Sequence, residues 1–185
     1  MKKFIISLLI SILFFQNFSL ANEIKTELYY KRQIENQRYR YNLSGFYKSV
    51  KKKNYIVIEA FLDAGFNPDS KHYGTPLIFY TIKEHDKKAL DIFLTHSADL
   101  NIASKNKNLL MCCIDSSNSA AVQILINHNI DVNQKFKAMT PLNYAIKKDQ
   151  SKITEMLLMA GAKPDEQTYE LVNKSKDEYL KSLFE

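Results

Sequence analysis

The chain has 185 residues, of which 45% are hydrophobic and 25% charged, and its formal net charge is +6. These fractions are those of ordinary globular proteins, so they exclude a fully disordered chain, a collagen-like fibre and a protein with many membrane spans. The sequence holds only 4 glycines and 2 cysteines. So few glycines disfavour a fold that depends on glycine-rich phosphate loops, and two adjacent cysteines supply neither a disulfide framework nor a four-ligand zinc site.

The N-terminus has the pattern of a secretory signal peptide. Two lysines precede an apolar run over residues 4–15, and the small residues Ser19 and Ala21 follow it. This pattern predicts cleavage after Ala21, so that residues 1–21 are a signal peptide and the protein is exported to the periplasm or secreted. The alternative is an uncleaved anchor, but the run is shorter than the roughly 20 apolar residues that a spanning helix needs. We therefore expect no stable membrane insertion after cleavage, and the abundance of Lys, Asn and Ile is typical of a bacterial protein from an AT-rich genome.

A segment of similar sequence occurs four times at a constant spacing of 32 residues. Apolar residues recur within it at offsets that fall on one face of a helix, so each copy predicts a helix. Each of these helices is expected to end at a residue in the left-handed conformation, which Gly adopts easily and Asn tolerates, whereas Ser fits least well. The four copies begin at Phe61, Phe93, Leu125 and Leu157, and the four helix ends are Gly65, Ser97, Asn129 and Gly161.

A second helix is predicted before each of these segments. Thr-Pro-Leu at residues 75–77 and 140–142 is a helix start, because Thr accepts a backbone N–H and Pro needs no partner at the first helical position. In the third and first copies the expected capping residues are Asn108 and Ser44. The second copy is one residue longer, and we expect the extra residue in the turn over residues 83–88.

On these residues the chain resembles the ankyrin-repeat family. The matching parts are the Thr-Pro-Leu starts, the apolar pairs that close the second helices, and the stretches 97–101, 129–133 and 161–162. The resemblance implies an all-α ankyrin-repeat solenoid, in which helix-turn-helix units joined by hairpin-like loops each bury an apolar face against their neighbours. The glycine that the family usually has between the two helices is absent. The units are expected at 41–70, 71–103, 104–134 and 135–166. An N-terminal capping segment that contains Ile24, Leu28 and Ile34 is expected at 22–40. A C-terminal capping helix or degenerate repeat is expected at 167–185.

The histidines and cysteines do not form a pattern for chemistry. His96 and His128 occupy equivalent positions at the ends of consecutive helices, where an imidazole favours the negative end of the helix dipole, so we predict a capping role rather than a metal site. Cys112 and Cys113 lie in a predicted helix and are expected to be buried and unreactive, although a redox-sensing or heme-ligating cysteine stays open. Nucleophile elbows, phosphate loops, His-Glu-x-x-His and Cys-x-x-Cys are absent from the sequence. The sequence therefore predicts a protein without catalytic residues, metal or cofactor.

The resemblance implies that a partner binds the loop tips and the inner face of the first helices. Nearly every unit contributes lysine there, with aromatic side chains between, and such a strip suits a protein with an acidic surface. The alternative is that these lysines only solvate the surface. Nucleic acid is not expected, because arginine clusters and known nucleic-acid modules are missing from the sequence. The predicted partner-binding residues are Arg40, Tyr41, Lys51, Lys52, Lys71, His72, Tyr73, Lys83, Lys105, Lys107, Phe136, Lys137, Met139, Lys147 and Lys148.

The most direct interpretation is an exported, monomeric, non-enzymatic module for protein–protein interaction. Two alternatives remain at this stage. One is a periplasmic accessory protein of a heme enzyme, for which His72, His85 and the cysteines would matter. The other is a secreted effector that acts on a host protein.

Overall fold

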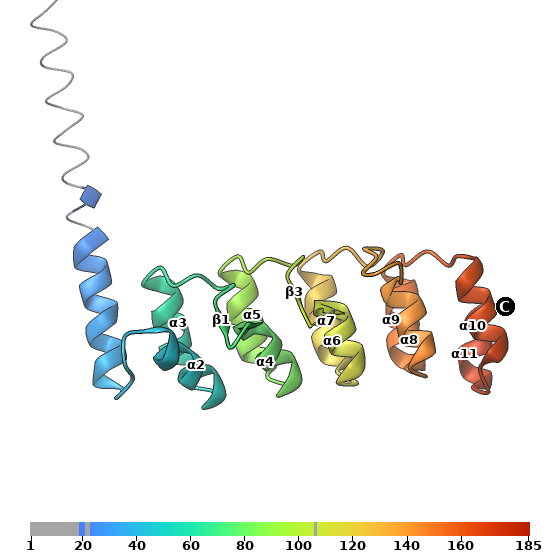
Figure 1. Ribbon diagram of the computed structural model, residues 1–185, viewed down its shortest axis with the longest axis horizontal. Coiled ribbons are helices and arrows are strands. Elements are labelled where there is room, and N and C mark those ends of the chain that lie inside the picture. The colour runs from blue at the N-terminus through green and yellow to red at the C-terminus, as the bar shows by residue number, and fades with distance from the viewer. Residues whose placement is uncertain (1–18, 21–22, 106) are drawn as a thin grey trace, which may run out of the picture.

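Helical pairs stack side by side along one axis of the molecule in the computed structural model (Figure 1), which describes residues 19–20, 23–105 and 107–185. The predicted signal peptide and its cleavage site lie largely at residues 1–18 and 21–22, outside the described residues. A first helix covers residues 23–36. The pairs that follow are α2 (Leu43–Lys51) with α3 (Tyr55–Asp63), α4 (Leu77–Lys83) with α5 (Lys87–Thr95), α6 (Leu109–Asp115) with α7 (Ser119–Asn127), α8 (Pro141–Lys147) with α9 (Ser151–Met159), and α10 (Glu166–Lys174) with α11 (Glu178–Ser182).

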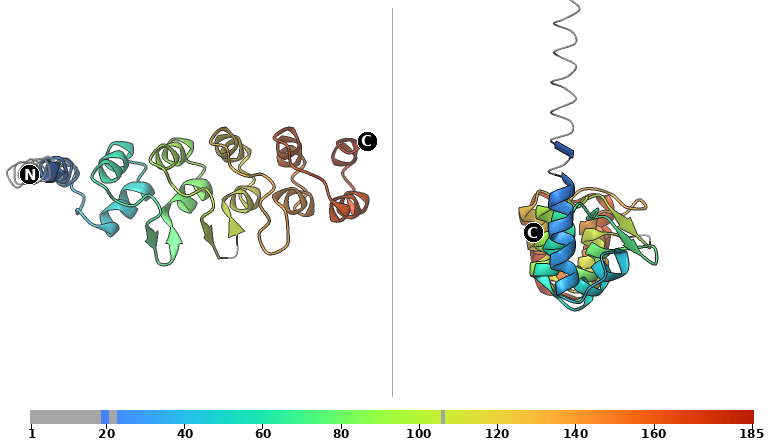
Figure 2. Two further views of the ribbon diagram at one scale, coloured as in Figure 1. Left: turned by 90° about the horizontal axis from the view of Figure 1, so that it is seen from above. Right: turned by 90° about the vertical axis from the view of Figure 1, so that its left-hand side faces the viewer.

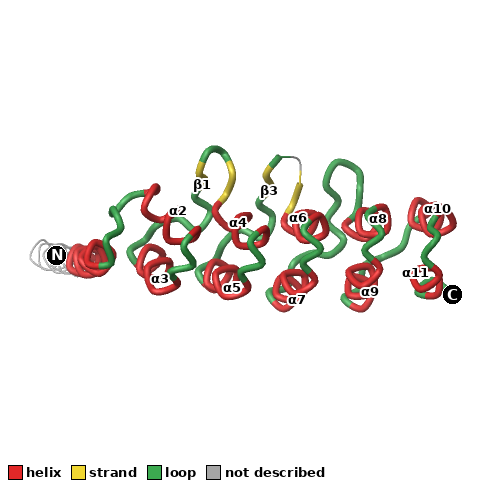
Figure 3. The backbone as a smooth tube through the Cα atoms, turned by 90° about the horizontal axis from the view of Figure 1, so that it is seen from below, coloured by secondary structure: helices red, strands yellow, loops and turns green. Residues whose placement is uncertain are grey.

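The two helices of each pair belong to two parallel rows (Figure 3). Helices α2, α4, α6, α8 and α10 pack in sequence along one row, and α3, α5, α7, α9 and α11 pack along the other. Every pair thus buries its apolar side against its neighbours, as expected for a solenoid. The predicted all-α repeat architecture is confirmed.

A short hairpin precedes the first helix of the second unit and of the third unit. Strand β1 (Lys71–His72) pairs with β2 (Thr75–Pro76), and β3 (Ala103–Ser104) pairs with β4 (Lys107–Asn108), both antiparallel. The fourth unit has only an isolated bridge between Phe136 and Met139 at the corresponding place. The hairpins project on the side of the first-helix row (Figure 2), so this row and the hairpin tips bound one face of the molecule.

The turn between the two helices of each unit keeps the 32-residue spacing without a break. Its left-handed residues are Lys53, His85, Ser117 and Asp149, with φ of 53°, 51°, 47° and 52°. Because His85 is in register, the turn over residues 83–88 contains no extra residue, and that prediction is wrong. The hairpins keep the same spacing, because β1 and β2 precede β3 and β4 by 32 residues, so the second unit contains no extra residue.

The start of α4 differs from that of α8, because α4 begins at the Leu of its Thr-Pro-Leu and α8 begins at the Pro. Thr140 caps α8, since its Oγ1 accepts the N–H of Asn143 at 3.1 Å. Thr75 instead belongs to β2 and pairs with His72, and Pro76 occupies the N-cap position without a side-chain hydrogen bond. The hairpin ladder has taken Thr75 away from the helix, so its predicted capping role is wrong.

The cap of α2 is Asn42, and the predicted cap Ser44 lies inside the helix. The Asn42 Oδ1 accepts the N–H of Gly45 at 2.9 Å. A Cβ at Gly45 would lie 1.9 Å from the carbonyl oxygen of Arg40, so only glycine lets the incoming chain pass this close to the helix. In α6 the predicted cap is confirmed, because Asn108 accepts the N–H of Met111 at 2.9 Å.

The predicted ends of the second helices are confirmed, including the one at serine. Gly65, Ser97, Asn129 and Gly161 have φ of 86°, 63°, 61° and 88°. Ser97 therefore adopts the left-handed conformation despite its Cβ, since this turn geometry recurs in every unit.

Aromatic rings fill the core between the first two units. The ring of Phe46 stacks on Phe61 and on Phe93, with centroid distances of 5.1 and 5.6 Å, and all three rings are fully buried. Burial of a side chain of this size contributes about 1.5–3 kcal/mol. The leucines of the first helices, such as Leu77 and Leu109, are fully buried as well.

The two ends of the stack are covered differently. At the N-terminal end Ile34 is fully buried, whereas Ile24 and Leu28 are 57% and 48% exposed. A helix over residues 23–36 is about 21 Å long and α3 only about 13 Å, which leaves its first turns without a helix opposite. At the C-terminal end α10 packs on α8 and α11 on α9, with Val172 and Leu180 buried.

A buried asparagine fixes this last pair to the fourth unit. Asn143 is fully buried, and its amide donates to Asp165 at 2.9 Å and to Gln167 at 3.1 Å, while its carbonyl accepts from Thr168 at 2.6 Å. The amide group has its donors and its acceptor satisfied by α10 and its cap. A polar side chain at a core position is therefore stable here.

Candidate interaction surface

The predicted partner-binding residues come from the first-helix row, the hairpins and the loop that corresponds to them. Their exposure falls into two groups. Arg40, Lys51, Lys52, Lys71, Tyr73, Lys83, Lys105, Lys137, Lys147 and Lys148 are exposed, and Tyr41, His72, Lys107, Phe136 and Met139 are half-buried.

The cations on this face are in part neutralised by Glu84, which the sequence analysis did not name. The Lys51 ammonium donates to Glu84 Oε1 at 2.5 Å, and Lys53 donates to the Glu84 carbonyl at 3.2 Å. The hydrogen bond and charge of Lys51 lower the pKa of the Glu84 carboxyl. Glu84 occupies the same position in its repeat as Lys52 and Lys148 occupy in theirs. An alignment of the repeats therefore indicates a negative charge among these lysines.

A second acid, Asp115, gathers three side chains from two units. It accepts hydrogen bonds from Lys107 on β4 and, at 2.7 Å, from the hydroxyl of Tyr144 on α8, and the Lys148 ammonium lies 3.7 Å away. Burial raises the pKa of the Asp115 carboxyl, but the hydrogen bonds from Lys107 and Tyr144 and the charge of Lys148 outweigh it and lower the pKa overall. The surface is therefore not a uniform basic strip, because two of the predicted lysines are held by one carboxylate.

The remaining predicted lysines carry the positive charge of this face. Within the part of the chain that the structure describes, they form no ion pair with an acid of the protein. They are Lys52, Lys71, Lys83, Lys105, Lys137 and Lys147.

Three lysines meet around a hollow of about 130 Å³ between the second and third units. Lys83 reaches it from α4, and Lys105 and Lys107 reach it from the hairpin of the next unit. Cys112 lines the floor of the hollow but is buried, and desolvation raises the pKa of its thiol. A thiol in this environment stays protonated and is a poor nucleophile.

An aromatic cluster lies beside the first hairpin. The ring of His72 stacks on Tyr47 with a centroid distance of 3.6 Å and an angle of 9°, Tyr73 meets His72 edge-on at 4.4 Å, and Tyr80 meets Tyr47 at 5.2 Å. Tyr73 is 91% exposed at the tip. Tyrosine is enriched at protein interfaces relative to the rest of the surface. Tyr47 and Tyr80 were not predicted, although Tyr80 shares its repeat offset with Tyr144, which binds Asp115 on the same face.

Two predicted positions have roles within the protein itself. Tyr41 stacks on Phe61 with a centroid distance of 6.2 Å and meets Phe66 edge-on at 5.2 Å, and its hydroxyl donates to Glu27 at 3.3 Å. It thereby joins the N-terminal helix to the first unit. Phe136 and Met139 close the fourth tip through their backbone bridge, and Lys137 and Ala138 between them are exposed.

The histidines at the helix ends bind acids of the preceding unit. His96 Nε2 lies 3.1 Å from Asp63 Oδ1, and His128 Nε2 lies 3.0 Å from Asp91 Oδ1. These contacts support the predicted structural role. Among residues 23–105 and 107–185, His, Cys, Asp and Glu form no group of three that would hold a metal ion.

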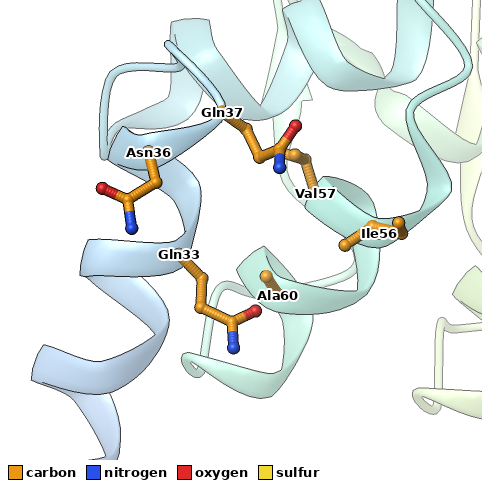
Figure 4. A pocket seen from close by; sticks show the side chains of 6 residues that line it. All are labelled: Gln33, Asn36, Gln37, Ile56, Val57 and Ala60. Atoms are coloured by element: carbon orange, nitrogen blue, oxygen red, sulfur yellow. The ribbon is translucent and has the colours of Figure 1, made fainter.

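At the N-terminal end, a hollow of about 280 Å³ separates the first helical segment from α3 (Figure 4). Side-chain amides line one wall of it and short apolar side chains the other. The lining residues are Gln33, Asn36, Gln37, Ile56, Val57 and Ala60. The groups that line it are neutral, so it offers neither acid–base chemistry nor a charged ligand site.

Among the described helices, none is both long and apolar enough to cross a membrane.

Comparison with known proteins places the architecture in one family. The sequence matches the family described as "Ankyrin repeats (3 copies)" over residues 46–136 and 80–168. No curated protein matches the chain. A similar solved structure is the crystal structure of the ankyrin repeat domain of Bcl-3, described as a unique member of the IkappaB protein family, with a TM-score of 0.67 and 14% identity over 76% of this chain. The match spans 66% of that domain's chain, and at this identity the likeness concerns the fold alone.

Proposed function

Because the chain belongs to the ankyrin repeat family, whose repeats are in general protein–protein interaction modules without enzymatic activity, we propose that it binds an acidic protein partner on the face formed by the first helices and the hairpins. The single observation that supports this proposal most is the set of exposed lysines on that face that form no ion pair within the described chain, next to the exposed Tyr73. Like charges on one face repel each other and attract an acidic surface.

We propose further that the partner is met after export, in the periplasm or outside the cell, since the N-terminal sequence has the pattern of a signal peptide. The test is fractionation of cells that produce the tagged full-length protein. Recovery in the osmotic-shock fraction or the medium, with a mass that fits cleavage after Ala21, supports export. Uncleaved protein in the cell interior would refute it.

The binding face is tested by reversing charges on it. Lys83, Lys137 and Lys147 are exposed and outside the ion pairs of the described residues, so changing all three to Glu is expected to leave thermal melting nearly unchanged. Capture of the partner from envelope extract should fall by about tenfold or more, because attraction is replaced by repulsion. Raising the salt concentration should weaken capture by the unmodified protein in the same direction.

A matched control distinguishes an effect of the charges on this face from an effect of the net charge of the protein. Lys87, Lys163 and Lys176 are exposed at other places on the molecule, and their change to Glu alters the total charge by the same amount. Capture should remain close to that of the unmodified protein. If both triple variants lose capture equally, or neither does, the proposed face is not the binding site.

A further inference from the structure

A pocket lined by three cations lies where the N-terminal segment enters the first repeat. Its volume is about 310 Å³, and its lining residues are Arg38, Arg40, Ser44, Gly45 and Lys48. No acidic residue lines it. In the described part of the chain, the three cationic side chains form no ion pair with any carboxylate.

The backbone fixes the two arginines at the rim. Arg38 follows the helix over residues 23–36 and has a φ of 62°, a conformation that is costly for a residue with a side chain. Arg40 is held by the close approach of its carbonyl to Gly45, which no other residue would permit. Both side chains are exposed and directed by a fixed main chain rather than by a flexible loop end.

Lys48 completes the set from α2. Its ammonium lies 5.5 Å from the centre of the Tyr39 ring, a cation–π contact that positions it without neutralising its charge. The first turn of α2 borders the pocket through Ser44 and Gly45, and its peptide dipoles add positive potential. No carboxylate of the described chain lies within ion-pair distance of these cations, so an external anion would be stabilised here.

We propose that this pocket binds a phosphate group. Two guanidinium groups and one ammonium carry three positive charges, which the single negative charge of a carboxylate does not balance. A phosphate monoester balances more of this charge, because it carries about −1.5 to −2 at neutral pH, and it offers three acceptor oxygens. Guanidinium groups bind such oxygens in a bidentate manner, which lysine cannot do. The ligand is a phosphate monoester, either free in solution or the headgroup of a lipid.

The proposal does not depend on the partner face. Of the residues predicted for partner binding, it uses only Arg40, whereas the capture test above uses Lys83, Lys137 and Lys147. Loss of one function can therefore be observed while the other is intact.

The test is a titration of the purified ¹⁵N-labelled protein with inorganic phosphate. Binding is monitored through the chemical shifts of the backbone amides. A parallel titration with sodium acetate at equal ionic strength tests whether a carboxylate binds as well. Saturable shifts are expected at residues 38–48 with phosphate and much weaker ones with acetate. The double variant Arg38→Gln/Arg40→Gln should weaken phosphate binding by about tenfold or more. Lys48→Gln, a single change of an exposed side chain, should weaken it by a smaller factor if the double variant fails to fold.

The control variant is Lys25→Gln/Arg32→Gln, which removes the same charge from exposed positions of the N-terminal helix outside the pocket. It should bind phosphate like the unmodified protein. Equal weakening in both double variants, acetate binding as tight as phosphate, or no saturable shift at all would overturn the proposal.

Vesicles of phosphatidylcholine with and without phosphatidic acid distinguish the source of the group. Binding to phosphatidic acid that disappears in the pocket variant identifies a lipid headgroup as a source. Phosphate binding without vesicle binding supports the pocket with a soluble ligand. Vesicle binding that survives in the pocket variant shows that lipid is bound elsewhere and excludes the headgroup as the ligand of this pocket.

Discussion

The imidazole of His96 joins two consecutive repeats through Asp63. Its Nε2 lies 3.1 Å from Asp63 Oδ1 on the preceding second helix, while its Nδ1 lies 2.8 Å from the carbonyl oxygen of Ile92 in its own helix. Each ring nitrogen therefore lies within hydrogen-bond distance of an acceptor oxygen. The imidazole thus caps its own helix, α5, and links it to α3 of the preceding unit.

A double-mutant cycle on His96→Ala and Asp63→Ala measures this bridge. The pair is partly exposed, so we expect a coupling of about 0.5–1 kcal/mol in the free energy of unfolding from urea titrations. A parallel cycle on His128 and Asp91, which make the equivalent contact one unit later at 3.0 Å, serves as an internal comparison. Additive single effects in the first cycle would show that the contact contributes nothing between repeats.

Asp86 is a position where asparagine should improve stability. Its Oδ1 accepts from the Ala89 N–H and the Tyr55 hydroxyl, both at 3.1 Å, but its Oδ2 is buried without a partner. One unit later Asn118 donates from Nδ2 to the Ile82 carbonyl at 2.9 Å. An amide at Asp86 would be placed to donate in the same way, so Asp86→Asn should raise the free energy of unfolding by about 1 kcal/mol.

The reverse change tests the same explanation. Asn118→Asp removes the donor to Ile82 and leaves a carboxylate oxygen against a carbonyl oxygen. It should lower the free energy of unfolding by at least as much as Asp86→Asn raises it. If Asp86→Asn destabilises the protein, the carboxylate makes a favourable interaction that the amide does not, and the explanation from an unpaired Oδ2 is wrong.

Thr154 carries a buried hydroxyl without a partner. The residue is fully buried, and its Oγ1 makes no hydrogen bond with any described residue. The same repeat offset holds the apolar residues Leu90 and Val122, so Thr154→Val should raise the melting temperature and add about 1 kcal/mol. Thr81→Val is the control, because the Thr81 hydroxyl donates to the Ile78 carbonyl at 2.7 Å and its removal should not stabilise the protein.

The stability of the Asp115 cluster should depend on pH. Asp115 has a lowered pKa, so its contribution is complete above the ordinary carboxyl range and is lost as pH falls through the lowered pKa. Asp115→Asn should therefore have a lower urea midpoint than the unmodified protein at about pH 7, and the gap should narrow towards about pH 3. A gap that is the same at both pH values would mean that the carboxylate charge does not stabilise this face.

Much of the fold could be predicted from the sequence because it depends on local rules that repeat. The left-handed ends at Gly65 and Gly161 and the cap at Asn108 follow from the conformational preferences of single residues. Four copies in register make each of these signals stronger than it would be alone. The errors at Thr75 and Ser44 occur where the incoming chain meets the helix: Thr75 pairs with His72 in the hairpin, and the side chain of Asn42 rather than Ser44 caps α2.

The sequence alone determined the length of the unit, the type of its helices and the presence of lysine on the inner offsets, because each of these depends on residue identity and spacing. Tertiary structure decided which of those lysines form ion pairs within the described chain. Glu84 neutralises Lys51 from 33 positions away, and Asp115 draws in Tyr144 from 29 positions away. Such contacts depend on the distance between side chains after the units have stacked. For the same reason the pocket of Arg38, Arg40 and Lys48 exists only once the N-terminal segment has packed against α2.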